Sequence, residues 1–273
     1  MATLDPKADS EALVTRLYHA FFGPAKYETK PADQEVLDRG ENYRLPFAGG
    51  TLAVSSWGNS GPKVLLMHGW GGSRAQMTGL VDPLLTAGYR AVAYDQPAHG
   101  ESDGKMTNLL EIAPTLGLIA KREGSFYAVL AHSFGTLITS YAVVNLGFSP
   151  PGKLVYFGTF NRLMDSLPRF KAMARLSDPL MEALRQRMYE NLGRERLESI
   201  SHESLAPQID IPLLMFHDAA DEVTPVEDSR AVAKAWKEAR YIETRGLGHR
   251  GALVAGEVHE QVVAFLRSQA GPL

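Results

Sequence analysis

The amino-acid sequence predicts an α/β protein with a mostly parallel, doubly wound sheet, and two regularities carry that prediction. Apolar runs of four to seven residues recur along the chain, as is typical of strands buried on both faces. Longer segments of helical periodicity separate them, which favours parallel strands with helices on both faces of the sheet. The expected strands are 63–67, 90–94, 125–131, 154–157, 211–216 and 241–244. The expected helices are 77–87, 108–122, 136–146, 226–239 and 259–268.

Two parts of the chain depart from this alternation. Extended runs at 43–47 and 52–57 flank Gly49-Gly50, which indicates an antiparallel hairpin ahead of the parallel strands. Residues 161–208 contain no strand candidate and are helical in pattern and rich in Arg and Met. A crossover between parallel strands normally needs only one helix. We therefore expect this segment to be an inserted helical lid over the carboxyl edge of the sheet, with an ordinary long crossover as the alternative.

The first 40 residues form a separate helical segment in the predicted organisation. Leu13, Val14, Leu17 and Phe21 share one stripe of a helix that Gly23-Pro24 ends. This helix is expected to cover part of the domain, and a mobile arm or a partner-binding helix are the alternatives. The core of the domain then comprises residues 41–160 and 209–273, with the lid between them.

The composition excludes several classes of function. A net charge of −3 over 273 residues offers no electrostatic footprint for a nucleic acid. The absence of cysteine removes disulfide frameworks, thiolate zinc sites and cysteine catalysis. Charged residues interrupt the N-terminus before any apolar core develops, and no stretch is long enough to span a bilayer. We therefore expect a cytoplasmic protein without a membrane span.

Motifs for metals and organic cofactors are missing as well. The sequence has no His-Glu-x-x-His pattern, and no Gly-x-Gly-x-x-Gly follows the first parallel strand. The glycine-rich stretch at 71–73 lacks the Gly-Lys-Ser/Thr ending of a phosphate loop. We expect neither a metal nor a cofactor.

The strongest chemical signal is Ser133. It lies in the run Ala131-His132-Ser133-Phe134-Gly135, between a predicted strand and a helical pattern that follows at once. So sharp a transition strains the backbone at its apex and requires small residues two positions before and after it. Ala131 and Gly135 meet that requirement. A serine exposed on such a turn is a candidate nucleophile.

From these residues the chain resembles the α/β-hydrolase superfamily over roughly residues 43–266. Its turn is similar to the family's Gly-x-Ser-x-Gly elbow, with Ala131 in place of the first glycine. The segment from Asp95 to Ser102 resembles the family's Asp-x-x-Gly-x-Gly-x-Ser loop, with Ala98 replacing a glycine. The resemblance implies an α/β-hydrolase fold with a helical lid, of the serine esterase or lipase kind. It also implies a triad in the order nucleophile, acid, histidine.

His249, between glycines after the last predicted strand, is the base that this order implies. The stretch 217–225 resembles the family pattern in which the acid precedes a proline by four positions, which points to Asp221. Asp218 and Glu222 are competitors in the same stretch. In some relatives the acid instead follows the previous strand, near Asn161 or Asp165.

The resemblance also implies an oxyanion hole and a set of substrate contacts. His68-Gly69-Trp70 is similar to the family's His-Gly-x signature, so the backbone N–H groups of Trp70 and Phe134 are the expected donors. Trp70, His132 and Phe160 are the expected substrate-binding residues.

The expected function is hydrolysis of a small to medium, hydrophobic acyl ester through an acyl-serine. Relatives with the same triad cleave C–C, thioester or amide bonds or act as cofactor-free perhydrolases, and these reactions stay open. A non-catalytic, ligand-binding member of the fold is the alternative of a different class. The expected partner is a small-molecule ester, not a nucleic acid, and the sequence does not predict an oligomeric state.

Overall fold

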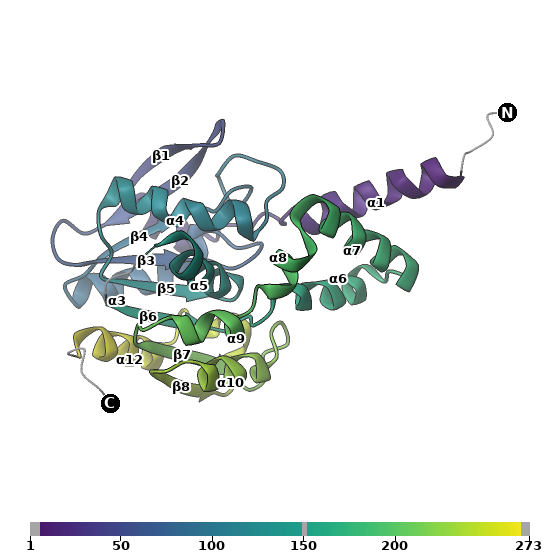
Figure 1. Ribbon diagram of the computed structural model, residues 1–273. Helices are drawn as coiled ribbons and strands as arrows, with labels where there is room; N and C mark the ends of the chain where they lie inside the picture. The colour runs from purple at the N-terminus through teal and green to yellow at the C-terminus, as the bar shows by residue number, and fades with distance from the viewer. Residues whose placement is uncertain (1–5, 149–151, 269–273) are drawn as a thin grey trace.

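The computed structural model describes residues 6–148 and 152–268 of the chain (Figure 1). Within these ranges the strands form one eight-stranded sheet in the order β1-β2-β4-β3-β5-β6-β7-β8. Strands β1 and β2 form the expected hairpin, β2 runs antiparallel to β4, and all later neighbours are parallel. The strands are β1 Glu41–Phe47, β2 Gly50–Trp57, β3 Lys63–Met67, β4 Arg90–Tyr94, β5 Ala128–His132, β6 Lys153–Phe157, β7 Leu213–Asp218 and β8 Ala239–Thr244. The predicted fold class is confirmed.

Helices cover both faces of the sheet, which explains why its central strands are continuous apolar runs. In β3, Leu65 and Met67 pack towards one face, while Val64 and Leu66 pack towards the other, and all four are fully buried. The first face is covered by α4 (Leu109–Glu123), α5 (Phe134–Leu146) and α10 (Val226–Ala235). The second face is covered by α3 (Val81–Thr86) and α12 (Gly256–Arg267).

The prediction of one continuous helix over residues 77–87 was wrong. The structure divides it into a 3-10 helix, η1 (Arg74–Leu80), and the short α3. Proline lacks an N–H donor, so it is favoured in the first turn of a helix and disfavoured further along it. Pro83 lies in the first turn of α3, which favours a start of the α-helix at Val81 rather than at residue 77.

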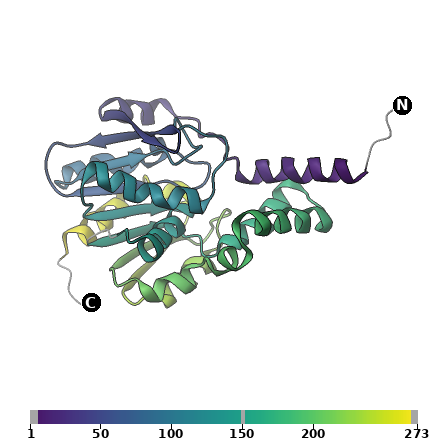
Figure 2. The same ribbon diagram turned by 45° about the horizontal axis from the view of Figure 1, so that its top comes forward.

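Residues 161–208, which the structure describes throughout, form a helical insertion between β6 and β7. Apart from one bridge between Arg162 and Ser201 they contain no β-structure. Two of the helices, α6 and α7, extend away from the sheet (Figure 2). The elements are η2 Leu163–Asp165, α6 Ser166–Ala174, α7 Asp178–Leu192, α8 Arg194–Ser199, α9 His202–Leu205 and η3 Ala206–Gln208.

The N-terminal helix α1 (Pro6–Phe22) lies against this helical insertion (Figure 2). Its buried residue Phe22 belongs to a small apolar cluster with Leu184 and Met188 of α7. That cluster is separate from the two that cover the sheet. A second short helix, α2 (Pro31–Asp38), then leads into β1. None of the helices in the described ranges is both long and apolar enough to cross a membrane.

A buried ion pair joins the loops that follow β3 and β4. The Asp95 carboxylate is fully buried and forms an ion pair with Arg74. It also accepts hydrogen bonds from the backbone N–H groups of Arg74 (2.6 Å) and Glu101 (2.8 Å). Ala98 between them has φ 63°, the left-handed conformation that glycine adopts without strain. Asp95 therefore fixes a strained loop at the carboxyl edge of the sheet.

Arg74→Met should destabilise the protein strongly, because it leaves the Asp95 carboxylate buried without its counter-charge. Breaking such a pair costs about 3–5 kcal/mol of unfolding free energy. Arg39→Met is the control, since it breaks an exposed pair with Asp82, and such pairs contribute little to stability. Urea denaturation of both variants measures the difference, and equal losses would contradict this account of Asp95.

Candidate active site

Ser133 occupies the turn between β5 and α5 in a strained conformation. Its φ of 52° and ψ of −124° lie in a region that side-chain-bearing residues rarely adopt. The backbone on either side holds it there. Ser133 N–H donates to the Phe157 carbonyl of β6 (2.8 Å), and the Ser133 carbonyl accepts from Thr136 N–H (3.0 Å).

The turn depends on glycines that let three segments approach one another. A Cβ on Gly135 would lie 2.5 Å from the His68 carbonyl oxygen, so α5 can start beside β3 only with glycine there. A Cβ on Gly69 would lie 2.8 Å from the Ser133 Cβ. Ala131, by contrast, is fully buried in the core, so the position two residues before the serine accepts a methyl group.

Asp221 and His249 come together at the carboxyl edge of the sheet, from the loops after β7 and β8. His249 Nδ1 lies 2.7 Å from Asp221 Oδ2. The other carboxylate oxygen, Oδ1, accepts the backbone N–H groups of Val223 (2.8 Å) and Thr224 (2.9 Å). Burial alone would raise the pKa of Asp221, but hydrogen bonds from His217 and His249 outweigh that effect and hold it well below its ordinary value near 3.8. Asp221 is therefore an ionised carboxylate at neutral pH.

The competing acids have other partners. Asp218 accepts the Leu247 N–H (2.8 Å), the Ala220 N–H (3.0 Å) and the Thr244 hydroxyl (3.0 Å), so it organises the loop that carries His249. Glu222 is exposed. Among the carboxylates of the described chain, only Asp221 contacts the His249 ring through a hydrogen bond or ion pair.

Asn161 and Asp165 form other contacts after β6. The Asn161 side chain is buried, and its backbone N–H donates to Asp228 (3.4 Å). Asp165 lies in η2, at the start of the helical insertion. The geometry thus brings Asp221, rather than either of these residues, to His249.

His132 packs on His249 rather than on the serine side of the turn. The two ring centroids are 4.6 Å apart, and His132 Nε2 donates to the His249 carbonyl oxygen (2.8 Å). Burial, and then the proximity of His249, lowers the pKa of His132 to about 3. A neutral, buried imidazole in this position supports the His249 loop.

Ser133 and His249 line the same cavity. The hydrogen bonds of the His249 ring run from Nδ1 to Asp221 and Thr224, so the Ser133–His249 pairing itself stays a prediction. Phe134 is the first residue of α5, where backbone N–H groups have no partner within the helix. The Trp70 ring lies edge to face against the Phe134 ring, with centroids 5.8 Å apart. Phe134 thus directly follows Ser133 at the start of α5, and Gly69, which precedes Trp70, lies next to Ser133. The oxyanion role of the two N–H groups stays a prediction.

Residues 64–265 match the family model described as "Alpha/beta hydrolase family". The chain belongs to this family. Solved structures with a similar fold include an esterase from Pyrococcus furiosus, with 19% identity over 92% of this chain and 98% of the other and a TM-score of 0.67. A bromoperoxidase from Bacillus anthracis has 17% identity over 84% and 100% and a TM-score of 0.67. A thioesterase domain from the curacin biosynthetic pathway has 18% identity over 84% and 99% and a TM-score of 0.60. These similarities, at 19% identity or less, show the fold alone, and the three proteins are named for different activities.

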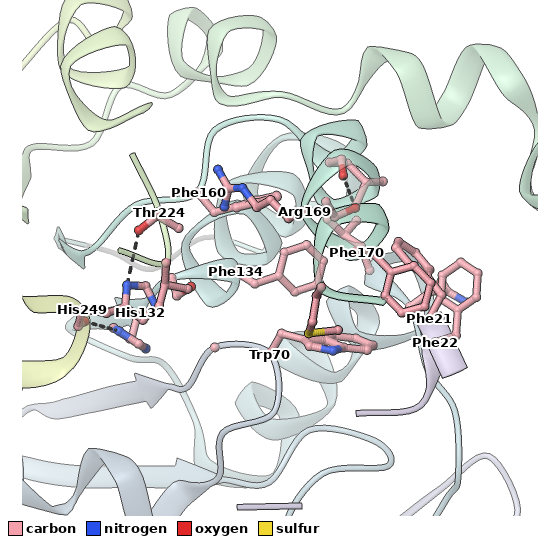
Figure 3. A pocket seen from close by; sticks show the side chains of 18 of the residues that line it. Phe21, Phe22, Trp70, His132, Phe134, Phe160, Arg169, Phe170, Thr224 and His249 are labelled. Atoms are coloured by element: carbon pink, nitrogen blue, oxygen red, sulfur yellow. Dashed lines mark hydrogen bonds between the residues drawn. The ribbon is translucent and has the colours of Figure 1, made fainter. Parts of the chain in front are cut away.

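The cavity of this α/β hydrolase has a volume of about 780 Å³ (Figure 3). The three expected substrate-binding residues, Trp70, His132 and Phe160, all line it. The residues described contain no group of three side chains suited to hold a metal ion. The rest of the lining comes mainly from the helical insertion, from the start of α4 and from α1.

Sequence reasoning missed two contributions to this site. Phe21 and Phe22 of α1 line the cavity, although eighteen residues (23–40) separate the end of α1 from the first strand of the sheet. His217 Nε2 lies 3.3 Å from Asp221 Oδ2, while His217 Nδ1 contacts the Ser229 hydroxyl (2.6 Å). The position of His217, four residues before Asp221 at the end of a strand, is the one signal that could have indicated it.

Asp221→Asn should lower the melting temperature at pH 7, with a difference that narrows on acidification. The folded pKa of Asp221 lies below its unfolded value, so the ionised carboxylate stabilises the fold above about pH 4 and this contribution is lost as pH falls further. Thermal melts at several pH values between about 7 and 3 measure the difference.

Asp210→Asn is the control for this comparison. Asp210 forms an exposed ion pair with Lys237, and such pairs contribute little to stability. The melting temperature of the control should equal that of the unsubstituted protein at every pH. A difference for Asp221→Asn that stays constant down to the lowest pH would contradict the stated cause.

Proposed function

We propose that this α/β hydrolase is a serine hydrolase that cleaves an ester of a small to medium, hydrophobic acyl group through an acyl-serine. One observation carries the proposal. A serine held in strained backbone geometry opens into the same cavity as His249, whose Nδ1 is bonded to the buried Asp221 carboxylate. A serine hydroxyl is a weak nucleophile and becomes reactive when a base can take its proton.

The Asp221 contact favours the tautomer of His249 that the reaction needs. An ionised carboxylate accepts a hydrogen bond, so Nδ1 carries the proton and Nε2 keeps its lone pair. Nε2 can then accept the Ser133 proton as the hydroxyl attacks the carbonyl carbon. Asp221 stabilises the resulting imidazolium without being protonated itself.

The remaining groups stabilise the oxyanion of the transition state and allow the alcohol and the acid to leave. The N–H groups of Trp70 and Phe134 would bind the oxyanion, where each donor contributes about 3 kcal/mol of transition-state stabilisation. The C–O bond to the alcohol breaks, and His249 returns the proton to the leaving oxygen. Water then attacks the acyl-serine with His249 again as base, and the acid is released while Ser133 regains its proton.

The cavity supports a hydrophobic acyl group. Phenylalanine, leucine and methionine side chains dominate the lining away from the triad residues. Residues 161–208 would serve as the lid that keeps this cavity apart from water. Thioester, amide and C–C cleavage and perhydrolysis use the same residues, and relative rates on matched ester, thioester and amide substrates distinguish them.

Ser133→Ala should reduce turnover of p-nitrophenyl butyrate by at least about 10⁴-fold while the protein stays folded. Ser166→Ala is the matched control, because Ser166 also lines the cavity but its hydroxyl donates to the Leu163 carbonyl (2.6 Å). The control should keep its activity within about twofold. Unchanged turnover in folded Ser133→Ala would overturn the proposal and favour a ligand-binding role for the fold.

A further inference from the structure

Helix α1 forms a wall of the cavity, although it lies outside the segment that matches the family. The family match begins at residue 64, whereas the cavity residues Phe21 and Phe22 end α1. Figure 3 shows His132 and His249 at one end of the cavity and the two α1 phenylalanines at the other, with Trp70 and Phe134 between them. The chain's own N-terminal helix thus lies opposite the triad residues.

Packing and hydrogen bonds fix this wall in place. Phe22 is buried among residues of α7, and its carbonyl accepts the Thr107 N–H just before α4 (2.9 Å). The Phe21 ring packs edge to face on Phe170 of α6, with centroids 5.2 Å apart. Val14, about two turns earlier on the same side of α1, is also buried, so the helix is anchored from Val14 to Phe22. The contacts of α1 with the rest of the fold therefore hold the two phenylalanines at this end of the cavity.

The polar side chains near this wall are already engaged by the protein. Asn108 Oδ1 accepts the Leu110 N–H (2.9 Å), and the Ser166 hydroxyl donates to a backbone carbonyl. The Arg169 guanidinium pairs with Asp228 (3.1 Å) and lies over the Phe160 ring, 4.7 Å from its centroid. A ligand at this end of the cavity therefore meets mainly hydrocarbon surfaces, which favours hydrocarbon in its own distal part.

We propose that the cavity binds a straight acyl chain that starts at Ser133 and ends against Phe21 and Phe22, so that α1 sets the longest chain accepted. The proposal rests on the proposed ester hydrolysis and names its substrate class, an ester of a medium-chain fatty acid. The cavity volume, about 780 Å³, is within the range of about 300–1,000 Å³ typical of small-molecule sites. Met173 and Met188 on its lining adapt readily to a flexible chain.

The test is the profile of kcat/KM for p-nitrophenyl esters from acetate to palmitate. Each methylene buried in the cavity should raise kcat/KM by up to about fourfold, until the chain meets α1 and the value falls. Phe21→Ala and Phe22→Ala each remove a phenyl ring from that end, which leaves a space that further methylene groups of the chain can fill. The chain length of the maximum should therefore move to longer esters in both variants.

Val14→Ala is the matched control. It shortens a buried side chain of the same helix that packs towards α7 and does not line the cavity. It should lower the melting temperature and leave the maximum where it is. A maximum that stays in place in folded Phe21→Ala and Phe22→Ala, or that moves as far in Val14→Ala, would overturn the role of α1. A wild-type profile that falls from acetate onwards would overturn the acyl-chain site.

A measurement of fatty-acid binding tests the acyl-chain site independently of the proposed catalysis. Calorimetric titration of the full chain with hexanoate, decanoate and palmitate needs no turnover. We expect the tightest-binding acid to be longer in Phe21→Ala than in the unsubstituted protein, even if no ester is hydrolysed. Ester turnover together with absent or unchanged fatty-acid binding would overturn the inference alone.

Discussion

The backbone of Ser133 is the constraint around which the rest of the site is arranged. A residue with φ 52° between a strand and a helix costs about 1–3 kcal/mol, and it persists only where neighbouring structure leaves no other conformation. Here β6 supplies a hydrogen bond to the Ser133 N–H, and two glycines allow the β3 loop and α5 to approach it. The same close approach brings Trp70 and Phe134 beside the serine. The contacts that hold the strained Ser133 backbone thus also fix the positions of the residues around it.

The acid and the histidine reach this point because parallel strands end at one edge. Loops after β7 and β8 carry Asp221 and His249, and the sheet places these strands side by side. Asp218 ties the second loop to the first through the Leu247 N–H, so the two loops are held as one unit. Two histidines then share the Asp221 carboxylate, which explains its low pKa. The Asp218 and Asp221 carboxylates thus have several hydrogen-bond donors each, which keeps the candidate site rigid.

The sequence predicted the features that local sequence patterns determine. The fold class followed from apolar runs and helical periodicity, and the turn at Ser133 followed from small residues between a strand and a helix. The order of Asp221 and His249 came from the resemblance to the family. The break before Pro83 was missed because the apolar pattern continues across it. The stripe on α1 indicated a buried face, but no local rule says that its partner is α7 and the cavity. That contact depends on how the helical insertion packs, and Phe21 joins the site only through it. His217, by contrast, reaches Asp221 from the end of β7.

The most direct test of Ser133 as an activated nucleophile is mass spectrometry of the protein after reaction with a fluorophosphonate. An activated serine hydroxyl attacks the phosphorus atom and displaces fluoride, which leaves a stable phosphonyl ester on the nucleophile. The account predicts a single adduct per chain, located by peptide mapping on Ser133 and formed much more slowly in Asp221→Asn. An adduct on another serine, or no adduct on the folded protein, would contradict it.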